Sequence, residues 1–136
     1  MQGRAMRWLV TCALISGTAL SAQAETPLDA EAFDAITQGR TLTFLVDGAP
    51  YGIERYMADR RVLWSFLDGQ CALGEWYPQD DSICFLYDID PEAPQCWEVF
   101  KDGDGLRTVF TEDPDRPAIY RAREGDEEMI CENFGT

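Results

Sequence analysis

From residue 41 onward, short runs of alternating apolar and polar residues follow one another, separated by turn residues. Leu42 and Phe44 stand on one face of the first run, and Val62 and Trp64 on one face of a later run. Alternation with a period of two is the pattern of half-buried β-strands. The strands are expected at 41–46, 51–57, 61–67, 70–77, 82–88, 95–101, 105–111, 118–123 and 128–132.

Turn signals such as Asp47-Gly48 and Asp68-Gly69 recur between these runs, about every ten residues. Even spacing of this kind is typical of an antiparallel meander. No long loop or linker interrupts the runs, so residues 25–136 are expected to form one domain. The predicted fold class is all-β, an antiparallel meander of about 8–9 short strands forming a small barrel or sandwich, with one N-terminal helix.

The N-terminal helix is indicated by a different pattern. Thr26 suits the N-cap and Pro27 the first helical position. Gly39 provides a stop at the C-terminal end, which gives a helix of about ten residues. Phe33 is expected to pack over the mouth or edge of the sheet. The rest of the apolar stripe consists of Leu28, Ala32, Ala35 and Ile36.

The first 24 residues have the organisation of a secretory signal peptide. Arg4 and Arg7 precede a mostly apolar run, and Ala22-Gln23-Ala24 matches a cleavage site. We expect cleavage after Ala24, which removes Cys12 and leaves a periplasmic or secreted, disulfide-stapled β domain with no membrane span.

The remaining chain is strongly acidic. It keeps nine of the 11 basic residues and all 25 acids, a formal charge of −16. Proteins that bind nucleic acid or an anionic membrane surface normally carry a basic patch. We therefore expect no nucleic-acid partner, and we interpret the acidity as a contribution to solubility.

Four cysteines remain after cleavage: Cys71, Cys84, Cys96 and Cys131. In a small exported domain this number favours two disulfides. The chain has no histidine and no C-x-x-C spacing, which argues against a zinc site and against a thioredoxin-like redox site. No metal and no cofactor are predicted.

The strand assignment restricts how these cysteines pair. Cys71 and Cys96 are separated by a whole strand, a gap of about 9 to 10 Å, whereas bridged Cα atoms lie about 5.5 to 6 Å apart. The preferred pairing joins Cys84 to Cys96 and Cys71 to Cys131. The second choice joins Cys71 to Cys84 and Cys96 to Cys131.

Residues suited to catalysis are few. Without histidine the usual general base is missing, and no G-x-S-x-G occurs, so we assign no catalytic residue and expect no enzyme. Glu54, Glu75 and Glu98 fall in predicted strands, and Glu98 stands out because its strand is aromatic. With 25 acids in the chain, however, any choice of a carboxylate pair is arbitrary.

Aromatic residues recur on consecutive strands. Such rings line a ligand cavity when a barrel is wide and fill the core when it is small. We prefer core packing, because the chain is short and these rings are its main source of buried area. The candidate ligand-lining residues are Trp64, Trp76, Phe85, Tyr87 and Trp97.

Between residues 76 and 97 the chain contains a tryptophan, a Cys-Phe-Leu-Tyr stretch and a Cys-Trp pair. These residues are Trp76, Cys84, Phe85, Tyr87, Cys96 and Trp97. Together with flanking sequence from about 42 to 110, they resemble small exported bacterial proteins grouped as a domain of unknown function. The resemblance implies a β-meander and a bridge between Cys84 and Cys96. It transfers no catalytic residue, because the family has no established activity.

The sequence thus predicts an exported, non-enzymatic binding or interaction module whose partner is a protein or a small apolar ligand. One alternative is a lipocalin-like inhibitor of secreted proteases, whose flexible N-terminus enters the target's active site. Another is a small apolar-ligand binder that uses an aromatic barrel interior. An extended N-terminus favours the inhibitor, an open aromatic cavity favours the ligand binder, and a filled interior favours the interaction module.

Overall fold

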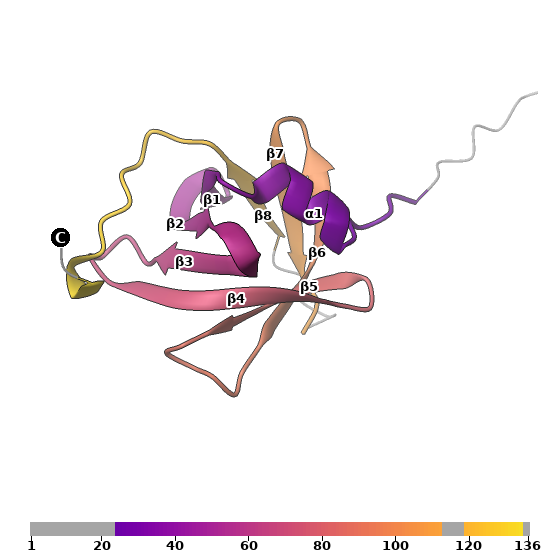
Figure 1. Ribbon diagram of the computed structural model, residues 1–136. Helices are drawn as coiled ribbons and strands as arrows, with labels where there is room; N and C mark the ends of the chain where they lie inside the picture. Colours follow the sequence, from indigo (N-terminus) through magenta and orange to yellow (C-terminus); the bar gives the residue numbers. More distant parts are fainter. Residues whose placement is uncertain (1–23, 113–118, 135–136) are drawn as a thin grey trace, which may run out of the picture.

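Eight antiparallel strands close into a barrel in the computed structural model, which describes residues 24–112 and 119–134 (Figure 1). Each strand pairs with the next along the chain, and β8 returns to pair with β1. The strands are β1 (Thr41–Val46), β2 (Ala49–Tyr56), β3 (Arg61–Ser65), β4 (Cys71–Gln79), β5 (Ser82–Tyr87), β6 (Gln95–Asp102), β7 (Gly105–Phe110) and β8 (Ile119–Arg123). The all-β meander is confirmed, as a closed barrel.

The ninth strand predicted at 128–132 is wrong. That segment is irregular and leads into a short 3-10 helix, η2 (Glu132–Phe134). Because β8 pairs with β1, the barrel has no free edge to which a further strand could add. The predicted signal peptide falls almost wholly on residues 1–23, which lie outside the described residues.

The register determines which side chains face inward. Glu54 on β2 lies opposite Leu42 on β1 and Trp64 on β3, so these three share the inner face. Near one end of the barrel the inward side chains pack around Phe33 into an apolar core. Its other buried members are Leu42, Tyr56, Val62, Trp76, Ile83, Phe85, Val99, Leu106 and Ala122.

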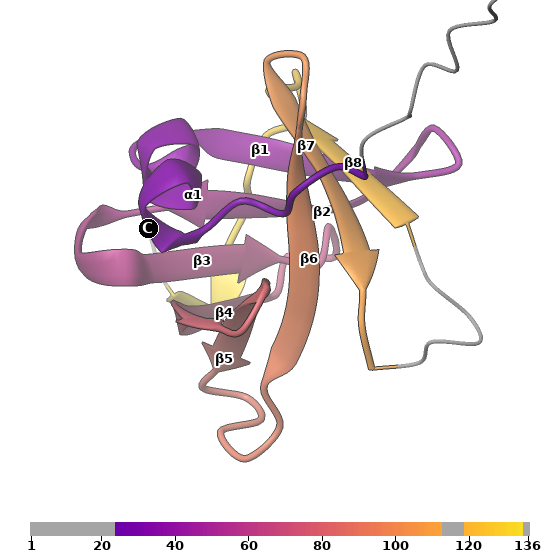
Figure 2. The same cartoon turned by 90° about the vertical axis from the view of Figure 1, so that its right-hand side faces the viewer.

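Helix α1 (Ala30–Thr37) carries Phe33 into this core. Its N-cap is Asp29, whose carboxylate accepts a hydrogen bond from the Ala32 N–H at 2.9 Å, and not Thr26 as predicted. The cause lies just before the helix, where the Leu28 N–H donates to the Val99 carbonyl at 2.7 Å. This bond holds the preceding segment in a non-helical path across β6 (Figure 2). The predicted C-terminal stop is confirmed, since Gly39 follows the helix with a φ of 81°.

Two disulfides join Cys84 to Cys96 and Cys71 to Cys131, the pairing preferred from the sequence. Cys84 lies directly opposite Cys96 on β5 and β6, whose ladder has only three residue pairs. The first bridge therefore links the two strands of a short ladder. The second ties the C-terminal segment to the first residue of β4.

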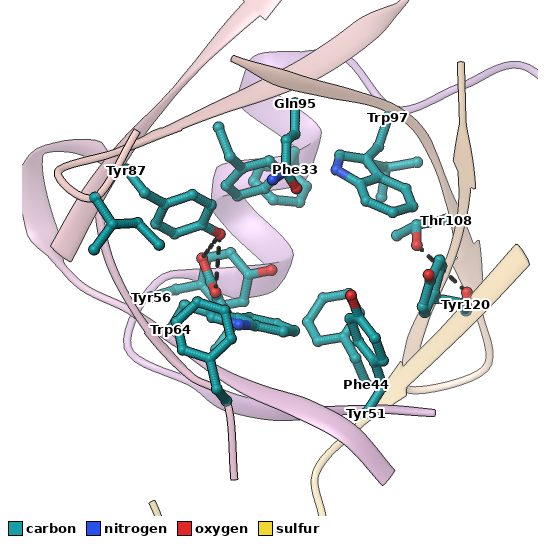
Figure 3. Close-up of a pocket in the computed structure, with 15 residues that line it drawn as sticks. Phe33, Phe44, Tyr51, Tyr56, Trp64, Tyr87, Gln95, Trp97, Thr108 and Tyr120 are labelled. Carbon is teal, nitrogen blue, oxygen red and sulfur yellow. Dashed lines mark hydrogen bonds between the residues drawn. The ribbon is translucent and has the colours of Figure 1, made fainter. Parts of the chain in front are cut away.

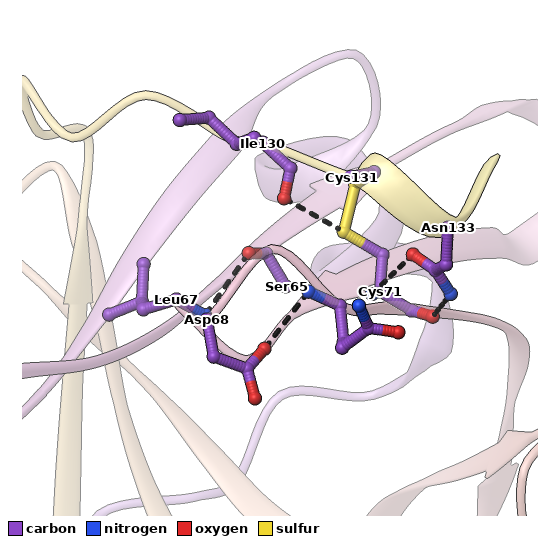
Figure 4. Close-up of a disulfide and its surroundings, with 8 residues drawn as sticks. Ser65, Leu67, Asp68, Cys71, Ile130, Cys131 and Asn133 are labelled. Carbon is purple, nitrogen blue, oxygen red and sulfur yellow. Dashed lines mark hydrogen bonds between the residues drawn. A yellow bond between two sulfur atoms is a disulfide. The ribbon is translucent and has the colours of Figure 1, made fainter. Parts of the chain in front are cut away.

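Residues 124–134, which we name the C-terminal strap, follow β8 and run to Cys71 on the outside of the barrel (Figure 4). At one point the Thr43 hydroxyl donates to the Glu127 carboxylate at 3.0 Å. At the other end the Asn133 side chain accepts from the Cys71 N–H at 2.9 Å and donates to the Cys71 carbonyl at 2.8 Å. β5 pairs with β4 no further than Gly74, so Asn133 satisfies backbone groups that β5 does not reach.

The strap explains why a row of residues on the outer face of the barrel is buried. Thr43, Ile53, Ser65 and Cys71 are direct cross-strand neighbours on β1 to β4, and each is at most 2% exposed. Because the strap is attached at Thr43 and at Cys71, it passes over the two residues between them. Within the described ranges, no helix is both long enough and apolar enough to span a bilayer.

Candidate ligand cavity

The barrel interior is filled at the α1 end and open at the other end. Phe33 closes the filled end, and beyond it lies a cavity of about 120 Å³ (Figure 3). Every strand except β4 contributes to the lining. The lining residues are Phe33, Phe44, Tyr51, Glu54, Tyr56, Trp64, Phe66, Phe85, Tyr87, Ile89, Gln95, Trp97, Val99, Thr108 and Tyr120.

Aromatic rings in mutual contact form much of the cavity wall. Tyr51 lies between Trp64 and Tyr120, with ring centroids 5.9 and 5.0 Å away. Tyr120 in turn meets Trp97 edge-on at 5.1 Å. At the floor, Phe33 contacts Tyr56 edge-on at 5.6 Å. Contacts of this kind hold the rings in place, so the cavity is largely pre-formed.

Two glycines make room for the rings. A Cβ at Gly52 would lie 2.0 Å from the Trp64 ring, and one at Gly74 would lie 2.7 Å from the Tyr87 ring. Each ring therefore occupies the space that a side chain on the neighbouring strand would take. This packing of rings over strand glycines brings Trp64 and Tyr87 into the cavity wall.

The mouth of the cavity is apolar and exposed. Tyr51, Phe66 and Ile89 line it and are 54%, 44% and 63% exposed. A molecule bound inside could extend past these side chains into solvent.

Glu54 is the one acid among the described residues that line the cavity, and it is 1% exposed. The Tyr87 hydroxyl approaches both of its carboxylate oxygens, at 3.0 and 3.2 Å (Figure 3). No arginine or lysine belongs to the described lining, so nothing there compensates a negative charge on Glu54.

Burial sets the protonation state of this acid. It raises the pKa of Glu54 from 4.5 to about 8, and the hydrogen bond from Tyr87 offsets only part of that rise. Burial, together with the nearby Glu54, also raises the pKa of Tyr56 and of Tyr87 well above 10. At neutral pH the empty cavity therefore holds a mostly protonated carboxyl group beside two neutral phenols.

Four of the five aromatic residues singled out from the sequence line the cavity: Trp64, Phe85, Tyr87 and Trp97. Trp76 does not. It lies nearer to α1, is 2% exposed, and meets Phe33 edge-on at 4.9 Å, with the Arg60 guanidinium 4.8 Å from its ring centroid. Trp76 is thus a core residue.

Sequence reasoning missed other parts of the wall. Phe44 and Tyr120 lie on the inner face by the same alternation that identified Trp64, so the pattern contained the signal for them. Tyr51 could not be found in this way. The register of β1 and β2 shifts between Phe44 and Leu45, and this irregularity leaves Tyr51 without a cross-strand partner in the ladder.

The strand glutamates are not brought together. Glu75 and Glu98 alternate with inward residues and lie on the outer face, so the buried carboxylate is Glu54 and not the Glu98 singled out from the sequence. The described lining of the cavity therefore holds one carboxylate and not the pair that glycoside chemistry needs. In the described parts of the chain, no group of three or more acids and cysteines is placed to hold a metal ion.

Comparison with known proteins finds no family model, no curated protein and no solved structure that matches this chain. The resemblance to small exported β-meander proteins accordingly stays a prediction. The cavity is therefore the feature from which a function is inferred.

Proposed function

We propose that this protein is a non-enzymatic binder of a small, largely apolar molecule, which it holds in the aromatic end of the barrel. The single observation that carries the proposal is the open cavity between the Phe33 floor and the exposed mouth. An apolar lining with a few polar groups is typical of small-molecule sites. This proposal replaces the preference for core packing, because the rings fill the interior only at the α1 end.

The size of the cavity limits the ligand. An engineered apolar cavity of about 150 Å³ holds benzene. At about 120 Å³, the cavity here suits one ring or a comparable branched group. A larger ligand would bury one such group and extend past Tyr51 and Ile89.

The protease-inhibitor alternative depends on a free N-terminal segment, and the structure offers no support for one. Leu28 donates a backbone hydrogen bond to Val99, and Glu25 forms an ion pair with Arg107. The segment then enters a folded helix that closes the barrel. We therefore favour ligand binding.

For the location, we propose the periplasm or the cell exterior, after cleavage behind Ala24. Two disulfides in a domain of this size fit an oxidising compartment.

The proposal is tested with a pair of variants on neighbouring positions of β7. Thr108 lines the cavity and Val109 faces outward, so Thr108→Phe fills the site while Val109→Phe adds the same ring outside it. Toluene and tert-butylbenzene serve as probes in calorimetric titrations. We expect the wild type and Val109→Phe to bind a probe, and folded Thr108→Phe to bind at least about tenfold more weakly. Equal affinity for all three proteins would contradict the proposal, as would no binding by the wild type.

A further inference from the structure

We propose that the cavity selects organic cations, either amines or quaternary ammonium compounds, whose charged group lies against Glu54 and the surrounding rings. This inference rests on the proposed function and names its ligand class. It is carried by the position of a buried acid inside an aromatic wall, where no arginine or lysine stands among the described lining residues.

The carboxylate of Glu54 has unused capacity to accept hydrogen bonds. A carboxylate has about four acceptor positions. Of the described side chains, only Tyr87 donates to Glu54, and its one hydroxyl proton is shared between contacts of 3.0 and 3.2 Å. A cationic group in the cavity would supply the missing charge and, if it carries N–H bonds, the missing donors.

The aromatic wall around Glu54 also favours a cation. The face of an aromatic ring is negative and attracts cations, most strongly for tryptophan. Trp64 is the direct cross-strand neighbour of Glu54, and Tyr56 stands two residues from it on the same strand. Ring faces and an ionised carboxylate favour the same kind of ligand and disfavour an anion.

The net charge of the molecule favours cations as well. With a formal charge of −14, or −16 without the first 24 residues, the protein attracts cations over a distance. A cation would thus be concentrated near the mouth and then held by Glu54.

The cavity also links the binding of a cation to the release of a proton. A cation pairs with ionised Glu54, while burial raises the pKa of that group to about 8, so binding near neutral pH must release a proton. Among the described lining residues no other charged side chain competes, and β1 and β3 present Leu42 and Trp64 to Glu54. The other titratable residues of the described lining are Tyr51, Tyr56, Tyr87 and Tyr120.

The test compares two probes of nearly equal shape: phenyltrimethylammonium, whose charge does not depend on pH, and neutral tert-butylbenzene. We expect the wild type to bind the cation about tenfold more tightly at pH 8.5. Its affinity for the cation should rise about ninefold from pH 6 to 7 and about fivefold from pH 7 to 8, while that for tert-butylbenzene stays level. Calorimetry in buffers of different ionisation enthalpy should detect close to one proton released at pH 7.

Two variants distinguish the effect of Glu54 on cation binding from the effect of the protein's net charge. Glu54→Gln should lose the preference for the cation and the pH dependence but keep the affinity for tert-butylbenzene. Glu75→Gln removes one acid from the outer face and should behave as the wild type.

If both probes bind the wild type equally at every pH, the inference is wrong and the proposed function stands. If neither probe binds, the proposed function fails as well. The comparison of probes on the wild type does not depend on whether Glu54→Gln folds.

Discussion

At the scale of single residues, Glu54 is the position where folding and ligand binding conflict. A leucine there would pack against Leu42 and Trp64 at no electrostatic cost, whereas an ionised carboxylate without a basic partner destabilises the fold. The protein limits this cost by keeping the group protonated at neutral pH. A carboxyl group in this position is therefore best explained by what it binds.

In the wild type without a bound cation, Glu54 should lower the free energy of unfolding as the pH rises. Its pKa is about 8 in the folded protein and near 4.5 in the unfolded chain, so the folded state holds the proton more tightly. The stabilisation from this tighter proton binding is fully present below pH 4.5. It is lost as the pH rises to 8, which lowers the free energy of unfolding by roughly 3 to 5 kcal/mol. Glu54→Gln lacks this loss, so its free energy of unfolding relative to the wild type should rise by that amount from pH 4.5 to 9.

Urea denaturation at several pH values measures this difference, with Glu75→Gln as the control. The control should run parallel to the wild type. If the free energy of unfolding of Glu54→Gln also ran parallel to that of the wild type across the pH range, Glu54 would have an ordinary pKa in the folded protein. That result would contradict our account.

At the scale of elements, alternation in the sequence predicted the strands and their inner faces well. The elements it missed depend on contacts distant in the chain. Thr26 is a good N-cap locally, but the bond from Leu28 to Val99 delays the helix to Asp29. The strap includes residues 128–132, where the sequence predicted a ninth strand. Its bonds instead run across the outer face, since β8 already closes the barrel.

Removing the Cys71–Cys131 bridge should release the strap and leave the barrel closed. The bridge spans 60 residues, so Cys71→Ala/Cys131→Ala should lose about 4 kcal/mol of unfolding free energy. Hydrogen exchange should quicken at Glu132, whose N–H donates to the Gly69 carbonyl, and hardly change in the β6–β7 ladder.

The double variant Cys84→Ala/Cys96→Ala serves as the comparison. Its bridge spans only 12 residues, so the loss should be about 3 kcal/mol, with the fastest new exchange at the β5–β6 ladder. Equal exchange profiles for the two double variants would contradict the separate roles given to the bridges.

At the scale of the whole molecule, the same aromatic residues could have filled a core or lined a cavity, and the sequence pattern did not distinguish these outcomes. The way in which the barrel ends are closed determines which residues fill the core and which line the cavity. Helix α1 inserts Phe33 at one end only, so Trp76 becomes core while Trp64 and Trp97 line the space beyond. That outcome depends on how far each ring lies from helix α1 along the barrel. The alternation of apolar and polar residues does not predict this distance.

The central claim is that small cations bind in this cavity, and the tryptophans provide a direct measurement. A chain beginning at Glu25 has three: Trp64 and Trp97 in the cavity wall and Trp76 in the core. We propose to follow their indole N–H signals by NMR during titration with phenyltrimethylammonium at pH 8.5. The account predicts saturable shifts of the Trp64 and Trp97 signals and little change at Trp76. A titration in which no indole signal moves, or in which Trp76 moves most, would contradict it.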